Sequence, residues 1–133
     1  MIPISRVVKY NRDTDDFTDF PSLKKARSHA GSCVLNGKLY VIAGHDGKDW
    51  LGTIERLDVE CGEEFWKIFV IPVLTKRECP MVSPLSNNQF LVAGGSHGGD
   101  LSDAFVVIDE GQILAQKVID RGDVSFRCAG RAE

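Results

Sequence analysis

The chain has 133 residues, the length of one ordinary domain, and it is 43% hydrophobic and 26% charged, as soluble globular proteins are. Its formal net charge of -3 argues against a general nucleic-acid binder and against attachment to an anionic membrane, because both need clustered Lys and Arg. No stretch is apolar for long enough to span a bilayer, and the N-terminus lacks the apolar run of a secretory signal. We therefore expect a cytoplasmic protein with neither nucleic acid nor a membrane as partner.

The first predicted elements lie in residues 1–25 and look like the end of a structural unit that occurs again later. Val7 to Asn11 resembles the segment around Leu57-Asp58, and Phe17 stands near the place that Trp66 has in the later unit. The acidic stretch between residues 13 and 19 lacks the glycine and the distal Glu of an EF-hand loop. A solvated turn explains this stretch better than a calcium site does.

The first complete unit reads as four short strands, in chain order Ala30 to Leu35, Lys38 to Gly44, Thr53 to Val59 and Phe65 to Ile71. Asn36-Gly37 predicts a tight hairpin turn, since that turn type needs positive φ at both residues. The second strand is apolar on both faces, so its sheet must be covered on both sides. No segment shows a sustained helical period, so other sheets must do the covering.

The second unit follows the first at a spacing of fifty residues. Arg27 matches Arg77, and the other pairs at this spacing are Tyr40 with Phe90, Ala43-Gly44 with Ala93-Gly94, and Leu51 with Leu101. The frame then slips by one, because Leu57-Asp58 matches Ile108-Asp109, and we place the slip between strands, where an insertion is cheap. Arg127 lies fifty beyond Arg77, so a further unit starts near the end of the chain.

Repeated four-stranded sheets stacked face to face are typical of a β-propeller. We expect residues 1–25 to end one blade, residues 26–75 and 76–125 to form two whole blades, and residues 126–133 to start another. A closed ring takes about four to eight blades. The sequence therefore predicts an incomplete propeller, either a fragment or a chain that self-associates through its open blade faces.

The ordered motifs of these units resemble the kelch repeat family along nearly the whole chain. They comprise the arginine before strand one, the Asn-Gly turn, an aromatic residue and a small pair in strand two, a leucine, a strand that ends in Asp, and Trp66. The second unit has Leu-Ala-Gln at residues 114–116 in place of the Trp, and the first has Gly44-His45 where the family has two glycines. The resemblance implies an all-β fold of stacked four-stranded antiparallel blades of a kelch-type β-propeller.

The resemblance also implies a protein-interaction module that binds another protein or peptide through its rim loops. In kelch adaptors that bind acidic peptides, arginines at the repeat position of Arg27, Arg77 and Arg127 line the mouth, so these three are candidate partner-binding residues. The alternative is a structural arginine bonded to a loop carbonyl. Trp50, in the loop after strand two, is a fourth candidate as a contact anchor, unless it folds back on its own blade.

The chemical motifs give no catalytic or metal site. His29, Cys79 and Cys128 share a repeat position but lack a carboxylate to complete a ligand set, and the four cysteines form no CxxC pair, although their even number leaves a disulfide open. His97 lies between Ser96 and Asp100 in one loop, a spacing that rarely gives a nucleophile and its base. We expect no enzyme and no cofactor; the alternative is part of a catalytic kelch-type propeller, a copper oxidase or a sugar epimerase.

Overall fold

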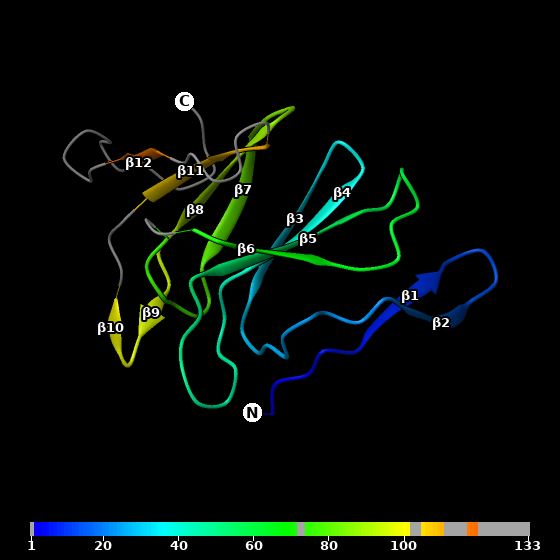
Figure 1. Ribbon diagram of the computed structural model, residues 1–133, viewed down its shortest axis with the longest axis horizontal. Coiled ribbons are helices and arrows are strands. Elements are labelled where there is room, and N and C mark those ends of the chain that lie inside the picture. Colours follow the sequence, from blue (N-terminus) through cyan, green and yellow to red (C-terminus); the bar gives the residue numbers. More distant parts are fainter. Residues whose placement is uncertain (1, 72–73, 102–104, 111–116, 120–133) are drawn as a thin grey trace.

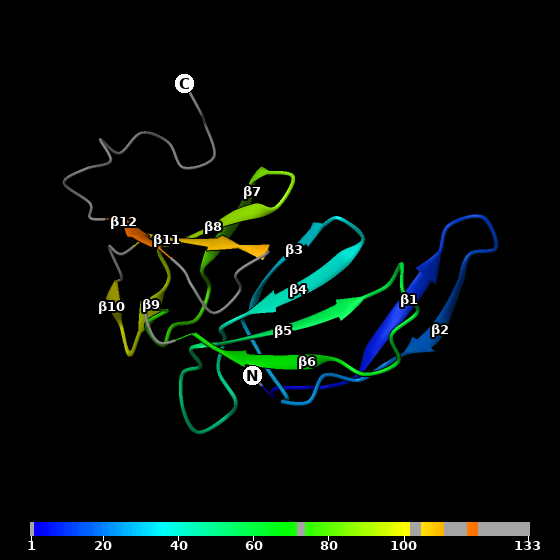
Figure 2. The same ribbon diagram turned by 45° about the horizontal axis from the view of Figure 1, so that its top comes forward.

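The computed structural model describes residues 2–71, 74–101, 105–110 and 117–119, and all regular elements in these ranges are β-strands (Figure 1). Two four-stranded antiparallel sheets pack face to face, and a two-stranded hairpin projects on the far side of the first sheet (Figures 1 and 2). The predicted all-β class with four-stranded antiparallel blades is confirmed. No helix among the described residues could cross a membrane.

The first sheet is a simple meander, in which each strand pairs with the next one along the chain. Its strands are β3 (Gly31–Leu35), β4 (Lys38–Ile42), β5 (Thr53–Asp58) and β6 (Lys67–Val70). Asn36 and Gly37 connect β3 to β4 with φ of 48° and 72°. The Asn-Gly turn therefore forms as the sequence predicted, with both residues in the left-handed region.

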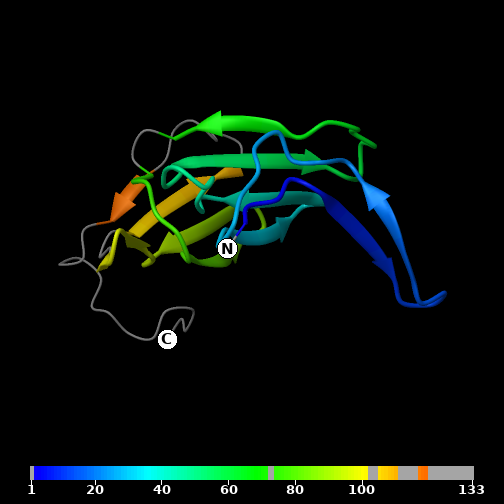
Figure 3. The same ribbon diagram turned by 90° about the horizontal axis from the view of Figure 1, so that it is seen from below.

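The second sheet repeats this meander with a small ribbon added at its rim. Its strands are β7 (Met81–Ser86), β8 (Gln89–Ala93), β11 (Phe105–Asp109) and β12 (Lys117–Ile119), in the spatial order β12-β11-β8-β7. Between β8 and β11, the strands β9 (Ser96–His97) and β10 (Asp100–Leu101) form a two-stranded ribbon. Seen from below, the two sheets overlap and the blue N-terminal hairpin extends to one side of them (Figure 3).

The N-terminal hairpin consists of β1 (Val7–Asn11) and β2 (Asp16–Phe20). Just before it, Ile4 and Arg27 exchange two backbone hydrogen bonds, and Leu51 likewise forms an antiparallel bridge with Arg77, whose N–H donates to the Leu51 carbonyl. The position of Ile4 before β1 thus matches that of Leu51 before β5. The hairpin therefore has the place, relative to the first sheet, of strands three and four of a unit.

The hydrophobic core lies between the two sheets. Tyr40 and Phe90 are fully buried, and their ring centroids are 4.9 Å apart. Alternate residues of β4, β8 and β11 reach this layer, and the buried cluster comprises Leu35, Tyr40, Ile42, Ala43, Ile54, Ile71, Leu74, Phe90, Val92, Val106 and Ile108. Burial of this apolar layer holds the sheets together, because each sheet alone would leave one of its faces in water.

The register of the two sheets corrects the predicted alignment of the repeat. Gly31 pairs with Ile42, whereas Met81 pairs with Ala93, so the frame has already slipped by one residue at strand two. The slip is an irregularity in β7 between Pro84 and Ser86, inside the strand and not in the loop where we placed it.

Phe90 is therefore the structural equivalent of Leu39, and Leu91 is the equivalent of Tyr40. The prediction that matched Tyr40 with Phe90 was wrong. Since successive residues of a strand point to opposite faces, this one-residue shift explains why Tyr40 and Phe90 face each other across the core.

Two further matches change with the register. The small pair of the first unit, Ala43-Gly44, has φ of 61° and 101°, and Gly94-Gly95 of the second has 69° and 90°. The position of the double glycine is thus Ala43-Gly44 in the first unit, not Gly44-His45. Leu51 is 7% exposed, whereas Leu101 is 85% exposed in the rim ribbon, so these two leucines are not equivalent.

Candidate functional site

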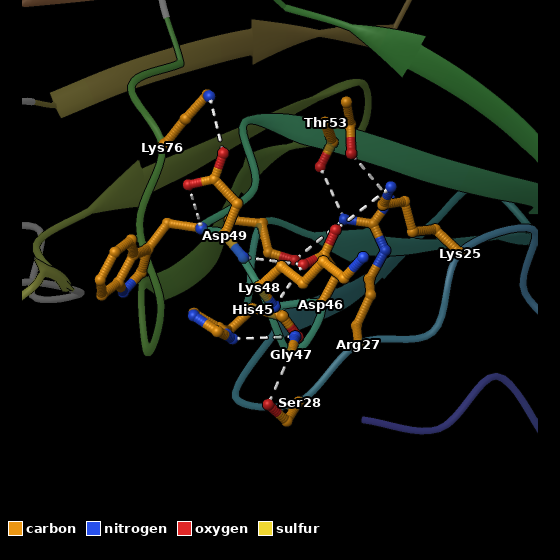
Figure 4. A network of polar contacts seen from close by, with 12 residues as sticks. Lys25, Arg27, Ser28, His45, Asp46, Gly47, Lys48, Asp49, Thr53 and Lys76 are labelled. Atoms are coloured by element: carbon orange, nitrogen blue, oxygen red, sulfur yellow. Dashed lines mark hydrogen bonds and ion pairs between the residues drawn. The ribbon is translucent and has the colours of Figure 1, made fainter. Parts of the chain in front are cut away.

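Arg27 lies buried at the start of the first unit, and its guanidinium is fully used inside that unit (Figure 4). Nε and Nη2 donate to Glu55 at 3.1 and 3.0 Å, and Nη1 donates to the carbonyl oxygens of Ala43 and Thr53 at 2.9 and 3.1 Å. Burial lowers the pKa of Arg27 below its ordinary value, and the Glu55 carboxylate opposes this shift. The group remains a charged, structural donor, because arginine stays protonated in proteins.

Glu55 was not among the predicted site residues, yet it organises this network. Its carboxylate, which is fully buried, also accepts the backbone N–H groups of Lys24 and Lys25 at 2.6 and 3.0 Å. A carboxylate with four donors fixes the segment that leads into β3. The signal in the sequence is an acidic residue inside a strand that must be covered on both faces, since such a residue needs a buried cation.

Arg77 has the same role in the second unit. It is fully buried, and it donates to the Thr75 carbonyl at 3.0 Å, to the Thr75 hydroxyl at 2.6 Å and to the Gly94 carbonyl at 3.0 Å. Its backbone N–H donates to Leu51, and its carbonyl accepts from Gly44, so it also ties the two sheets together.

The two arginines therefore have the geometry of the structural alternative that the sequence left open. Arg27 is 5% exposed and Arg77 is 0% exposed, so neither guanidinium forms part of a surface that a partner could contact. Arg127 lies outside the described residues. The ring of recognition arginines finds no support in this arrangement, because a buried guanidinium bonded within the fold is not available to another chain.

Trp50 lies at the rim, where it joins the two sheets. Its ring centroid is 5.0 Å from that of His45 and 4.4 Å from that of His97, and both histidine rings stand nearly perpendicular to the indole. His45 follows β4 of the first sheet, and its Nδ1 accepts the backbone N–H of Gly47 at 2.9 Å. His97 comes from the ribbon of the second sheet. We call Trp50, His45 and His97 the rim cluster.

The loop that presents Trp50 is held by its own carboxylates (Figure 4). Asp46 accepts the backbone N–H groups of Lys48 and Asp49 at 2.9 and 2.8 Å, and it pairs with the Lys25 ammonium at 3.2 Å. These contacts, the backbone hydrogen bonds first, lower the pKa of Asp46 to about 2. Asp49 forms a second pair with Lys76, also at 3.2 Å. The loop is thus attached to the start of both units.

The other candidate groups do not assemble into a metal site within the described residues. His29 Nδ1 lies 3.7 Å from a carboxylate oxygen of Glu78, and the backbone N–H of Cys79 donates to the His29 carbonyl at 2.7 Å. No group of three His, Cys, Asp or Glu side chains in the described ranges could hold a metal ion. Cys33, Cys61 and Cys79 are free thiols, and Cys128 lies outside the described residues.

Comparison with known protein families gives one match, to the kelch motif, over residues 26–63. This range contains Arg27, the Asn-Gly turn, Tyr40, the rim loop and Glu55. It covers β3, β4 and β5, the strands that contain the motifs quoted from the sequence.

Curated relatives carry the same signal. The chain is 35% identical over 78 residues to the influenza virus NS1A-binding protein homolog of Xenopus laevis, 38% over 53 residues to kelch-like protein 8 of Caenorhabditis elegans, and 38% over 48 residues to kelch-like protein 5 of Homo sapiens. These alignments cover 58%, 40% and 36% of this chain and 12%, 8% and 6% of the relatives. Together with the two four-stranded antiparallel sheets, they support a kelch repeat family for this chain, with the kelch motif itself matched over residues 26–63.

Proposed function

We propose that this chain is a non-catalytic protein-interaction scaffold that binds another protein or peptide through the rim formed by residues 45–50 and 96–101. The observation that carries this proposal is the rim cluster, in which one partly exposed tryptophan lies between histidines from two sheets. Tryptophan is among the residues that dominate the free energy of protein interfaces.

Three features of the rim support a binding role. The loop of Trp50 is fixed before any partner arrives, by the Asp46 turn and by the pairs Lys25–Asp46 and Lys76–Asp49, and preorganisation lowers the entropy cost of binding. Leu101 adds an apolar side chain, 85% exposed, on strand β10 of the neighbouring ribbon. One relative is itself named as a binding protein, the NS1A-binding protein homolog.

The test compares partner capture by two single variants of the intact chain. Trp50→Ala removes the rim anchor. The control, Phe65→Ala, removes an aromatic side chain that is 73% exposed and lies in the connection between β5 and β6, at the end of the sheet away from the rim. We expect Trp50→Ala to lose proteins that the wild type and Phe65→Ala both retain in affinity purification with quantitative mass spectrometry. If Trp50→Ala retains them all while its circular dichroism stays native, the rim is not the binding surface.

A further inference from the structure

The face of the first sheet that is turned away from the second sheet is open over β3 and β4, whereas Glu55 and Leu57 of β5 on the same face are buried. Val34 on this face is 60% exposed, and Leu39 and Val41 beside it are partly exposed. In the corrected register their equivalents on strand two of the second sheet, Phe90 and Val92, are fully buried against the first sheet. The same structural position is thus a packed interface in one unit and a bare apolar surface in the other.

The N-terminal hairpin has an open edge beside this face. β5 pairs with β4 on one edge and β6 on the other, and β11 likewise pairs with β8 and β12. Within the part of the chain that the structure describes, β1 pairs with β2 alone. β1 matches β5, and β2 takes the place of β6. The other edge of β1, where β5 has β4 as its neighbour, therefore presents unpaired backbone groups to which another strand can pair.

We propose that this open face and the edge of β1 together bind a β-hairpin of a partner chain, placed as β3 and β4 are placed on the second sheet. Two strands fit where one would not, because the second strand of the hairpin pairs with β1 and both strands cover the apolar face. The proposal concerns a different surface from the rim and does not depend on it.

The packing between the two sheets indicates how large the partner's side chain should be at the place that Gly31 has in β3. Gly31 of the first sheet lies against Val82 of the second so closely that a Cβ on Gly31 would come 2.5 Å from a Val82 methyl group. At the open face the place of Val82 is taken by Ser32, which is exposed. A small residue there leaves room, so the partner hairpin should carry a large side chain at the place of Gly31.

The polar contacts between the two sheets indicate which side chains the partner hairpin should have at two further places, those of Tyr40 and Lys38. Glu110 accepts the Tyr40 hydroxyl at 3.0 Å and lies 3.5 Å from the Lys38 ammonium. At the open face the place of Glu110 is taken by Val59, which is 43% exposed and accepts no side-chain hydrogen bond. The partner should therefore be apolar at the place of Tyr40 and uncharged at that of Lys38, since a buried unpaired group would cost binding free energy.

This chain contains one hairpin that meets these conditions and one that does not. The hairpin β7–β8 has Met81, Leu91 and Gln89 at the three places, whereas β3–β4 has Gly31, Tyr40 and Lys38. In the folded chain β8 already pairs with β11, so the probe must be a separate peptide. Synthetic peptides of residues 77–95 and 27–44 are a matched pair of probe and control.

The experiment is a fluorescence anisotropy titration of each labelled peptide with the intact chain under reducing conditions. We expect the 77–95 peptide to bind and the 27–44 peptide to bind about tenfold more weakly or not at all. Ser32→Arg, at an exposed position in the middle of the face, should weaken binding of the 77–95 peptide by a similar factor. Ser86→Arg, exposed on β7 away from the face, is the matched control and should have no effect.

Several results would overturn the proposal. Equal binding of the two peptides would show that the chemistry of the face does not select its partner. If Ser32→Arg binds as the wild type does, the peptide has replaced the chain's own β7–β8. Sedimentation of the chain alone tests another occupant, because self-association that Ser32→Arg abolishes would assign the face to a second copy. Trp50→Ala should leave peptide binding unchanged, so failure of the rim hypothesis is separable from failure of this one.

Discussion

At the scale of single residues, Arg27 should be a stability residue. Arg27→Ala leaves the buried Glu55 carboxylate without its cation, and breaking a buried pair in this way costs about 3–5 kcal/mol. The matched control is Arg6→Ala, because the Arg6–Asp19 pair is exposed on both sides and such pairs contribute at most about 1 kcal/mol. Urea unfolding measures both changes. Equal effects of the two substitutions would contradict the buried network.

Cys33 provides a second test at this scale. Burial raises the pKa of its thiol to about 11, so the reactive thiolate is scarce at neutral pH. In a variant that keeps Cys33 as its single cysteine, we expect alkylation by iodoacetamide at pH 8 to follow global unfolding. Mass spectrometry with increasing urea measures this rate. Labelling in native buffer as fast as in urea would mean that the layer between the sheets is open to solvent.

At the scale of the loop, Asp46 should make stability depend on pH in the acid range. Its pKa is lowered to about 2 in the folded chain, so its contribution is present above its ordinary pKa near 4 and is lost as the pH falls through 2. We expect Asp46→Ala to be less stable than wild type at pH 6 and the difference to shrink toward pH 2.5. Asp46→Asn, which keeps an acceptor for the turn, should lose less. Urea midpoints across this pH range are the measurement.

Gly44, which follows strand two, should not tolerate substitution by any residue that has a Cβ. A Cβ on Gly44 would lie 2.7 Å from the Ser28 carbonyl oxygen, and Gly44 has φ of 101°. Gly62 also has positive φ, at 71°, but nothing lies within 4 Å of its Cβ position. Gly62→Ala should therefore cost about 1 kcal/mol, the conformational term alone, and Gly44→Ala should cost more, because backbone must move. Comparable thermal midpoints for the two variants would contradict the close approach.

At the scale of the whole molecule, alternation and turn chemistry predicted the four strands of each unit well. These two signals could not locate the slip in β7. Phe90, Leu91 and Val92 are all apolar, so the strand has apolar residues on both faces in either register. The structural role of Arg27 was one of two alternatives, but the sequence could not identify Glu55 as its partner, since that carboxylate is 28 residues away. The rim loop was located, but the contacts of His45 and His97 with Trp50 were not predicted, as the two histidines come from separate units.

The face-to-face packing of two kelch units, with the slip in the second, is the claim on which the rim and the open face both depend. A NOESY spectrum of the protein tests it most directly. We predict cross-peaks between the Tyr40 and Phe90 rings, whose centroids are 4.9 Å apart, and between Gly31 and a Val82 methyl group. Cross-peaks from Tyr40 to Leu91 in place of Phe90 would restore the uniform spacing of fifty residues and contradict the account.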